Sequence, residues 1–110
     1  LVSLRVQSDE EMLETMNHLQ EVLLSETSDA ESKNDAYNDL LLISSNKSDE
    51  EKLEKIIKEE FTYDSFVKIN NNNITVVIES EKHDYELANK IIRRISNEFS
   101  DNKYITVKFN

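Results

Sequence analysis

The sequence predicts an α+β fold in which three N-terminal helices are followed by a β-β-α-β segment, giving a three-stranded sheet with helices packed on one face. Three observations predict it. Apolar residues recur at helical spacing through the first half of the chain. Two stretches rich in β-branched residues then flank a run of asparagines. A further helical stretch and an alternating stretch complete the order.

A short phrase, Ser-Asp-x-Glu, is expected to open each of the three N-terminal helices. It returns at Ser8, Ser28 and Ser48, each time just before apolar residues at helical spacing. In a capping box the Ser side chain accepts a hydrogen bond from an early backbone N–H, and the Glu three residues later reaches back to the cap. We therefore expect three capping boxes, with calcium binding and phosphorylation as alternatives. An EF-hand loop is excluded, because the chain has no glycine for its central turn.

In the second half of the chain, the spacing of the apolar residues changes from that of a helix to that of β-strands. We expect strands at Ser65–Ile69 and Ile74–Ser80, joined by a turn in which Asn70–Asn73 replace the usual glycine. The helical period returns from His83 to Phe99, and Tyr104–Phe109 then alternates as a third strand. A right-handed crossover through the last helix makes the third strand parallel to the second.

The first strand is then expected in the middle of the sheet, antiparallel to both neighbours. Such a sheet has exposed edges and one bare face, toward which Phe66 and Val77 should point. Cover by long side chains and a partner site are both open interpretations of that face.

Composition removes several classes of function. The chain has no cysteine and no glycine, which excludes Cys-based zinc sites, P-loops and Rossmann fingerprints. No run of 18 apolar residues occurs, and the chain begins with Leu1, so we expect an excised fragment, with any signal or anchor segment lying upstream. Residues 1–60 hold 16 acidic and 6 basic side chains, so nucleic-acid binding by that half is disfavoured. We also expect no small-molecule substrate.

Catalytic and metal-binding candidates are few. His18 follows Glu14 by four residues and His83 precedes Glu86 by three, but two ligands do not make a metal site. Arg93-Arg94 is expected to be a solvated pair, or else to form a salt bridge with an acidic neighbour. No nucleophile with an evident base stands out, so we expect no enzyme, no metal and no cofactor; a small hydrolase using Glu and His pairs is a remote alternative.

Several phrases in this order resemble a known family. They are Ala36-Tyr37, "LEKIIK" leading to an aromatic and "DSFV", then "ITV" followed by "SEKH", and finally "YITVKF". Together they are similar to the extracytoplasmic domain of the stage III sporulation protein AH family, from about Arg5 to Phe109. The resemblance implies a fold similar to the ring-building motif of secretion-system basal-body proteins. It also implies one extracytoplasmic domain over residues 1–110, with a helical segment at 1–47 and an α-β-β-α-β module at 48–110.

The resemblance further implies a partner and a place. The family is anchored in the outer forespore membrane by an upstream helix, and its domain lies between the mother-cell and forespore membranes. It binds the LytM-like ectodomain of stage II sporulation protein Q in a channel, and a homo-oligomeric ring is a further expectation. The alternative function is a soluble cytoplasmic adaptor without a membrane tether.

The partner is expected on the first two helices, where apolar residues exceed a single stripe. The expected contact residues are His18, Leu19, Val22, Tyr37 and Leu41. Each of them is alternatively a core residue between the helices and the sheet.

Overall fold

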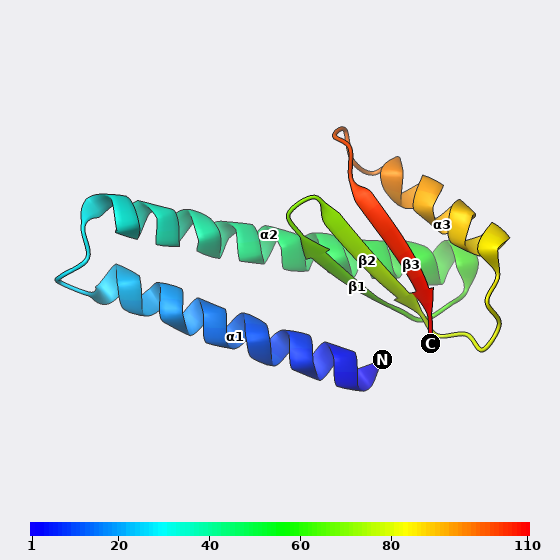
Figure 1. Cartoon of the computed structure of the whole chain (residues 1–110), viewed down its shortest axis with the longest axis horizontal. Helices are drawn as coiled ribbons and strands as arrows, with labels where there is room; N and C mark the ends of the chain where they lie inside the picture. The colour runs from blue at the N-terminus through cyan, green and yellow to red at the C-terminus, as the bar shows by residue number, and fades with distance from the viewer. The chain divides into compact units, whose positions relative to one another are not determined.

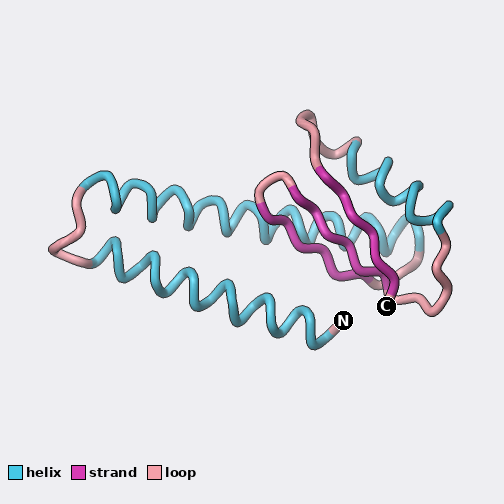
Figure 2. The backbone as a smooth tube through the Cα atoms, viewed as in Figure 1, coloured by secondary structure: helices cyan, strands magenta, loops and turns pink.

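The computed structural model describes all residues 1–110, and its elements confirm the α+β class and the β-β-α-β order. Figures 1 and 2 show two long helices followed by the sheet and a third helix. The elements are α1 (Val2–Leu24), α2 (Ala30–Phe61), β1 (Ser65–Asn70), β2 (Asn73–Ile78), α3 (Tyr85–Ser96) and β3 (Tyr104–Phe109). None of the helices is long and apolar enough to cross a bilayer. The chain forms two compact units, a helical unit (Val2–Asn46) and a mixed unit (Lys47–Asn110).

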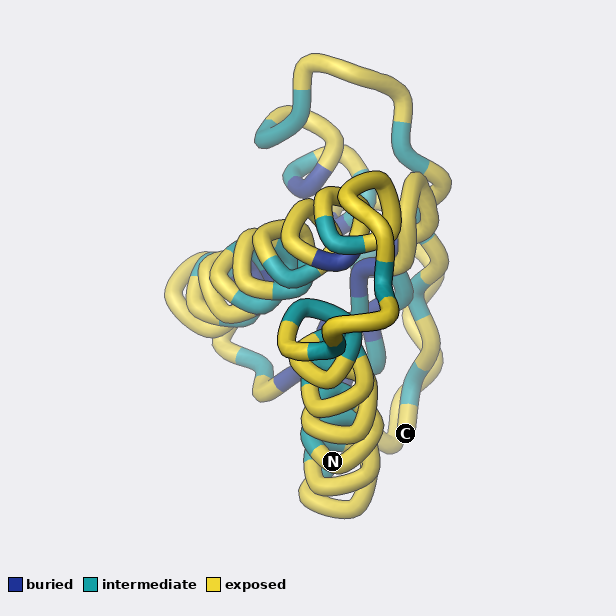
Figure 3. The backbone as a smooth tube through the Cα atoms, turned by 90° about the vertical axis from the view of Figure 1, so that its left-hand side faces the viewer, coloured by how far each residue is buried: buried dark blue, intermediate teal, exposed yellow.

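The helical unit contains α1 and the first half of α2, joined by a turn at residues 25–29. The predicted apolar stripe of α1 is half-buried, at Met12, Met16, Leu19 and Leu23. No residue of α1 is fully buried, and Figure 3 shows the coil nearest the N-terminus exposed or intermediate throughout. In this unit only Ala36, on α2, is fully buried. The unit is therefore held by a narrow seam of partly covered side chains.

The Ser-Asp-x-Glu phrases do not open three separate helices. α1 begins at Val2, so Ser8 lies inside it, and α2 runs through Ser48 without a break. The predicted helix starts at Ser8 and Ser48 are therefore wrong. The physical reason at Ser48 is that the nine residues between Ile43 and Leu53 are all polar but include no glycine or proline, so nothing interrupts the backbone hydrogen bonds of the helix.

The middle phrase does mark a helix start, but the cap is the aspartate. The Oδ1 atom of Asp29 accepts a hydrogen bond from the backbone N–H of Ser32 at 2.8 Å. The backbone N–H of Lys33 donates to the carbonyl of Asp29 at 3.1 Å, which closes the first turn of α2. Hydrogen bonds from the backbone N–H and then from the side chain of Ser32 lower the pKa of Asp29 below its ordinary value.

The sheet has the strand order β1-β2-β3, with β2 in the centre. β2 pairs antiparallel with β1 and parallel with β3. The parallel pair confirms one prediction, whereas the prediction of β1 in the middle is wrong. The crossover through α3 places β3 directly beside β2, and the short β1–β2 hairpin takes the other side of β2. The hairpin turn has Asn71 at φ 55°, as expected where asparagine replaces glycine.

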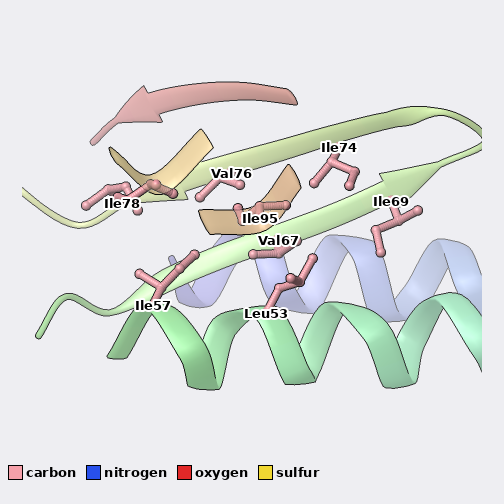
Figure 4. Packing of buried hydrophobic residues seen from close by; sticks show 9 residues of the cluster. Leu53, Ile57, Val67, Ile69, Ile74, Val76, Ile78 and Ile95 are labelled. Atoms are coloured by element: carbon pink, nitrogen blue, oxygen red, sulfur yellow. The ribbon is translucent and has the colours of Figure 1, made fainter. Parts of the chain in front are cut away.

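The core of the mixed unit lies between one face of the sheet and two helices. It contains Leu53 and Ile57 from α2, Ile91 and Ile95 from α3, and Val67, Ile69, Ile74, Val76 and Ile78 from the strands. Figure 4 shows these side chains converging between α2 and the hairpin. Phe66 and Val77 are paired in register and half-buried on the opposite face, as predicted from the alternation. α3 begins at Tyr85, two residues later than predicted, and Asp84 caps it.

Candidate interaction surfaces

The first half of α2 carries an exposed face with no charged side chain. Tyr37 and Leu41 are 54% and 53% exposed and lie one turn apart. The exposed neighbours on the same face are polar but uncharged. We define the uncharged stripe as Asn34, Tyr37, Asn38, Leu41, Ser44, Ser45 and Ser48, which share about a third of the helix circumference. Since 33% of the chain is charged, a stripe about four turns long without a charge is distinctive.

The five expected contact residues fall into two groups. Tyr37 and Leu41 lie together on the uncharged stripe. His18 is exposed on α1, while Leu19 and Val22, also on α1, are half-buried. Because most of their surface is already covered, Leu19 and Val22 offer less free area for a partner than Tyr37 and Leu41 do.

Sequence reasoning missed the polar part of the stripe. The signal was present as uncharged side chains recurring every three or four residues from Asn34 to Ser48. It was hidden by the expected helix break at Ser48, which assigned the two ends of the stripe to different helices. Charge depletion around an aromatic anchor is typical of the centre of a protein interface.

The two edges of the sheet differ in how their backbone groups are satisfied. On the β1 edge, the backbone N–H of Val67 donates to Oε2 of Glu54, and that of Ile69 donates to Oε2 of Glu50, each at 2.8 Å. Both carboxylates come from α2. On the other side β3 pairs only with β2, and Tyr104, Thr106 and Lys108 are exposed. The three strands carry two lysines, Lys68 and Lys108, and no acidic residue.

Glu50 is the buried carboxylate of the fold, with 7% of its surface exposed. Burial raises the pKa of Glu50 above its ordinary value, because the charged form is poorly solvated there. The hydrogen bond from Ile69 and the nearby lysines favour the charged form and only partly offset that cost. Glu50 therefore provides the acceptor for the backbone N–H of Ile69 on the β1 edge.

A salt-bridge network connects α2 to α3. Nε of Arg94 lies 2.8 Å from Oε2 of Glu60, and its guanidinium also binds Glu98. Nζ of Lys52 reaches Oε2 of Glu98 at 3.1 Å. The pKa of Glu98 is lowered, first by Arg94 and then by Lys52. Of the two expectations for Arg93-Arg94, the salt bridge holds for Arg94, while Arg93 is exposed.

The histidines lie apart from any metal-binding arrangement. No group of three or more His, Asp or Glu side chains is placed to hold a metal ion. The ring of His83 stacks on Phe109 with centroids 5.6 Å apart, at the C-terminal end of β3. His83 thus lies beside the C-terminal end of β3.

Comparisons with known proteins agree with the resemblance seen in the sequence. A family model described as "SpoIIIAH-like protein" matches residues 1–106. Stage III sporulation protein AH of Bacillus subtilis (strain 168) is 28% identical over 91 residues, which cover 83% of this chain and 42% of that protein. This chain thus spans less than half the length of that curated relative.

A solved structure has the same fold. It is described as "Structure of the SpoIIQ-SpoIIIAH pore forming complex", and one of its chains matches with a TM-score of 0.87 at 24% identity. The match covers 99% of this chain and 95% of the solved one. With a family model matching nearly every residue and a shared fold, the chain belongs to the SpoIIIAH-like protein family.

Proposed function

We propose that this domain is a non-enzymatic interaction domain in sporulation that binds the ectodomain of a SpoIIQ counterpart from the same organism. The observation that carries the proposal is the fold, which matches a chain from a structure described as a SpoIIQ-SpoIIIAH pore-forming complex. Membership of the SpoIIIAH-like family supports it. In this proposal the chemistry of the domain is recognition, and its partner has a LytM-like fold.

The uncharged stripe on α2 is the proposed contact surface. Tyr37 and Leu41 supply an aromatic and an aliphatic anchor, and the surrounding Asn and Ser side chains lose little on desolvation compared with charges. His18, Leu19 and Val22 on α1 are proposed as a flanking contact. The acidic side chains outside the stripe favour a partner with basic groups around its own apolar centre.

The proposal includes a location and a higher assembly. The domain would lie between the mother-cell and forespore membranes, tethered by a helix upstream of Leu1. Several copies would associate side by side in a ring through heterologous contacts, in which two different surfaces of the domain meet. Both parts rest on the family membership.

The proposal is tested by mixing the domain with the purified SpoIIQ-counterpart ectodomain and measuring the mass of the eluting species by light scattering. We expect a 1:1 complex at tens of micromolar concentration or below. Two separate monomer peaks under those conditions would overturn the proposed partner.

Substitution of the anchors tests the contact surface. We expect Tyr37→Ala and Leu41→Ala each to weaken binding about tenfold or more, since truncating an interface anchor costs roughly 1.4 kcal/mol or above. Leu42→Ala is the matched control, because Leu42 is 51% exposed on the same helix but points to another face. If Leu41→Ala and Leu42→Ala bound the partner with equal affinity, the stripe would not be part of the interface.

A further inference from the structure

The β1 edge of the sheet is closed by side chains. An edge strand normally presents a row of unpaired backbone N–H and C=O groups to which another chain can pair. Here the outward N–H groups of Val67 and Ile69 already donate to Glu54 and Glu50. An incoming strand would have to displace both carboxylates, and displacing Glu50 would leave a charge in a buried position. Strand addition on this side is therefore unfavourable.

The β3 edge has no such cover over most of its length. The N–H of Tyr104 donates to the carbonyl of Asn72 at 2.8 Å, and the N–H of Asn110 donates to that of Ile78 at 2.9 Å. Since successive residues of a strand alternate in direction, the even-numbered residues of β3 bond to β2. The N–H and C=O groups of Ile105 and Val107 consequently point away from the sheet. Toward the end of the strand, the His83 ring stacks on Phe109. The open edge is thus Ile105–Lys108.

The side chains along the open edge specify what fits there. Ile105 and Val107 are half-buried on the core face and would pack against apolar side chains of an added strand. Lys108 is exposed on the opposite face. No acidic residue lies on any of the three strands, although the chain as a whole has a net charge of −10. The complementary strand therefore alternates apolar and acidic residues.

A second copy of this chain is a poorer occupant of the same edge. Pairing β3 with β3 of another molecule would bring two Lys108 side chains onto one face with no carboxylate between them. None of the chain's own strands supplies the acidic residues that the edge lacks. The charge pattern therefore favours a strand from a different protein.

We propose that β3 accepts an extended, alternating apolar and acidic segment of the partner ectodomain as a fourth strand, paired along Ile105–Lys108. The inference rests on the proposed function for the identity of that partner. Main-chain hydrogen bonds from Ile105 and Val107 would supply affinity, and Lys108 would select for a carboxylate. The contact adds to the one proposed on the uncharged stripe.

Two substitutions with a matched control test the edge by isothermal titration with the SpoIIQ-counterpart ectodomain. Lys108→Glu should weaken binding about tenfold or more, because it places like charges opposite each other. Lys82→Glu, the same charge change at an exposed loop position, should change the affinity by less than about twofold. Val107→Pro should weaken binding while the sheet persists, since its N–H faces away from β2 and proline is tolerated on an edge strand.

Amide hydrogen exchange of the wild-type complex supplies a readout that does not depend on any variant folding. We expect the amides of Ile105 and Val107 to be protected at least about tenfold on binding. If the wild type binds but these amides and both edge variants are unchanged, the edge proposal fails and the proposed function stands. If the wild type does not bind, the proposed function fails and the edge proposal fails with it.

Discussion

At the scale of single residues, Glu50 couples the stability of the fold to pH. Burial raises its pKa in the folded state above the ordinary value of 4.5, so the folded chain holds the proton more tightly than the unfolded chain. The contribution of Glu50 to stability is therefore fully present below pH 4.5, and it is lost as the pH rises through the folded-state pKa. Near neutral pH the buried charge is a cost that the hydrogen bond from Ile69 only partly offsets.

Glu50→Gln should therefore stabilise the protein at neutral pH. The amide oxygen still accepts the hydrogen bond from Ile69, and no charge is buried. The advantage over the wild type should shrink as the pH falls toward 4.5. Urea unfolding between about pH 4 and pH 8 measures the free energy of unfolding of both proteins, with Glu51→Gln at an exposed neighbouring position as the control.

A companion substitution tests the hydrogen bond itself. Glu50→Ala should cost about 1–3 kcal/mol relative to Glu50→Gln, because it leaves the buried N–H of Ile69 without its acceptor. A wild type more stable than Glu50→Gln at neutral pH would contradict the assignment of a net burial cost.

The role of Glu50 and Glu54 could not be predicted from the sequence. Both residues lie in or near a Ser-Asp-x-Glu phrase, which locally resembles a helix cap. Their partners Ile69 and Val67 come 19 and 13 residues later, and such a long-range pairing leaves no periodic signal. Alternation did predict which face of each strand is buried, because that depends only on neighbouring residues.

At the scale of elements, the continuity of α2 shows where local signals compete. Ser48 and Glu51 have the spacing of a capping box, yet no glycine or proline interrupts the polar stretch between Ile43 and Leu53, and the helix runs through it. The same phrase at residues 28–31 follows a true turn, and there Asp29 accepts a hydrogen bond from Ser32, one of the free N–H groups in the first turn of α2. The strand order was missed for a similar reason, since it depends on how the crossover through α3 closes and not on the strands themselves.

Asp29→Ala should lower the thermal midpoint, and Ser48→Ala should leave it unchanged or raise it slightly. Asp29 is a cap at the start of α2, whereas Ser48 lies inside the helix, where Ala is favoured by about 0.5 kcal/mol. Because the folded-state pKa of Asp29 is lowered, its stabilisation is present above pH 3.8 and is lost as the pH falls through the folded-state pKa. Circular dichroism melts of both variants check this. If Ser48→Ala lowered the thermal midpoint more than Asp29→Ala does, the interpretation of a helix start at Ser48 would be restored.

At the scale of the whole molecule, burial is divided unequally between the two units. Every member of the core cluster lies in the mixed unit, whereas the helical unit has one fully buried residue, Ala36 at 2% exposure. The helical unit also holds ten acidic and two basic side chains, a net of −8 out of −10. Few buried contacts and like-charge repulsion both lower the free energy needed to open it.

Hydrogen exchange should therefore separate the two units. We expect amides of α1 to exchange at least about tenfold faster than those of β2 and α3 under native conditions. Moderate salt should slow exchange in α1 more than in β2, because it screens the repulsion among the acidic side chains. Equal protection of α1 and β2 would show that the helical unit opens only with the whole fold.

The closed β1 edge also limits how many other chains can pair with the sheet. Unlimited strand-by-strand growth needs two open edges per molecule, one to receive a strand and one to offer. A sheet with Glu50 and Glu54 on one edge can be extended once and then stops. Edge pairing can thus join this domain to one other chain but cannot build a fibre. Any assembly of many copies must grow through a different surface. Strand addition then does not determine how many subunits the assembly contains.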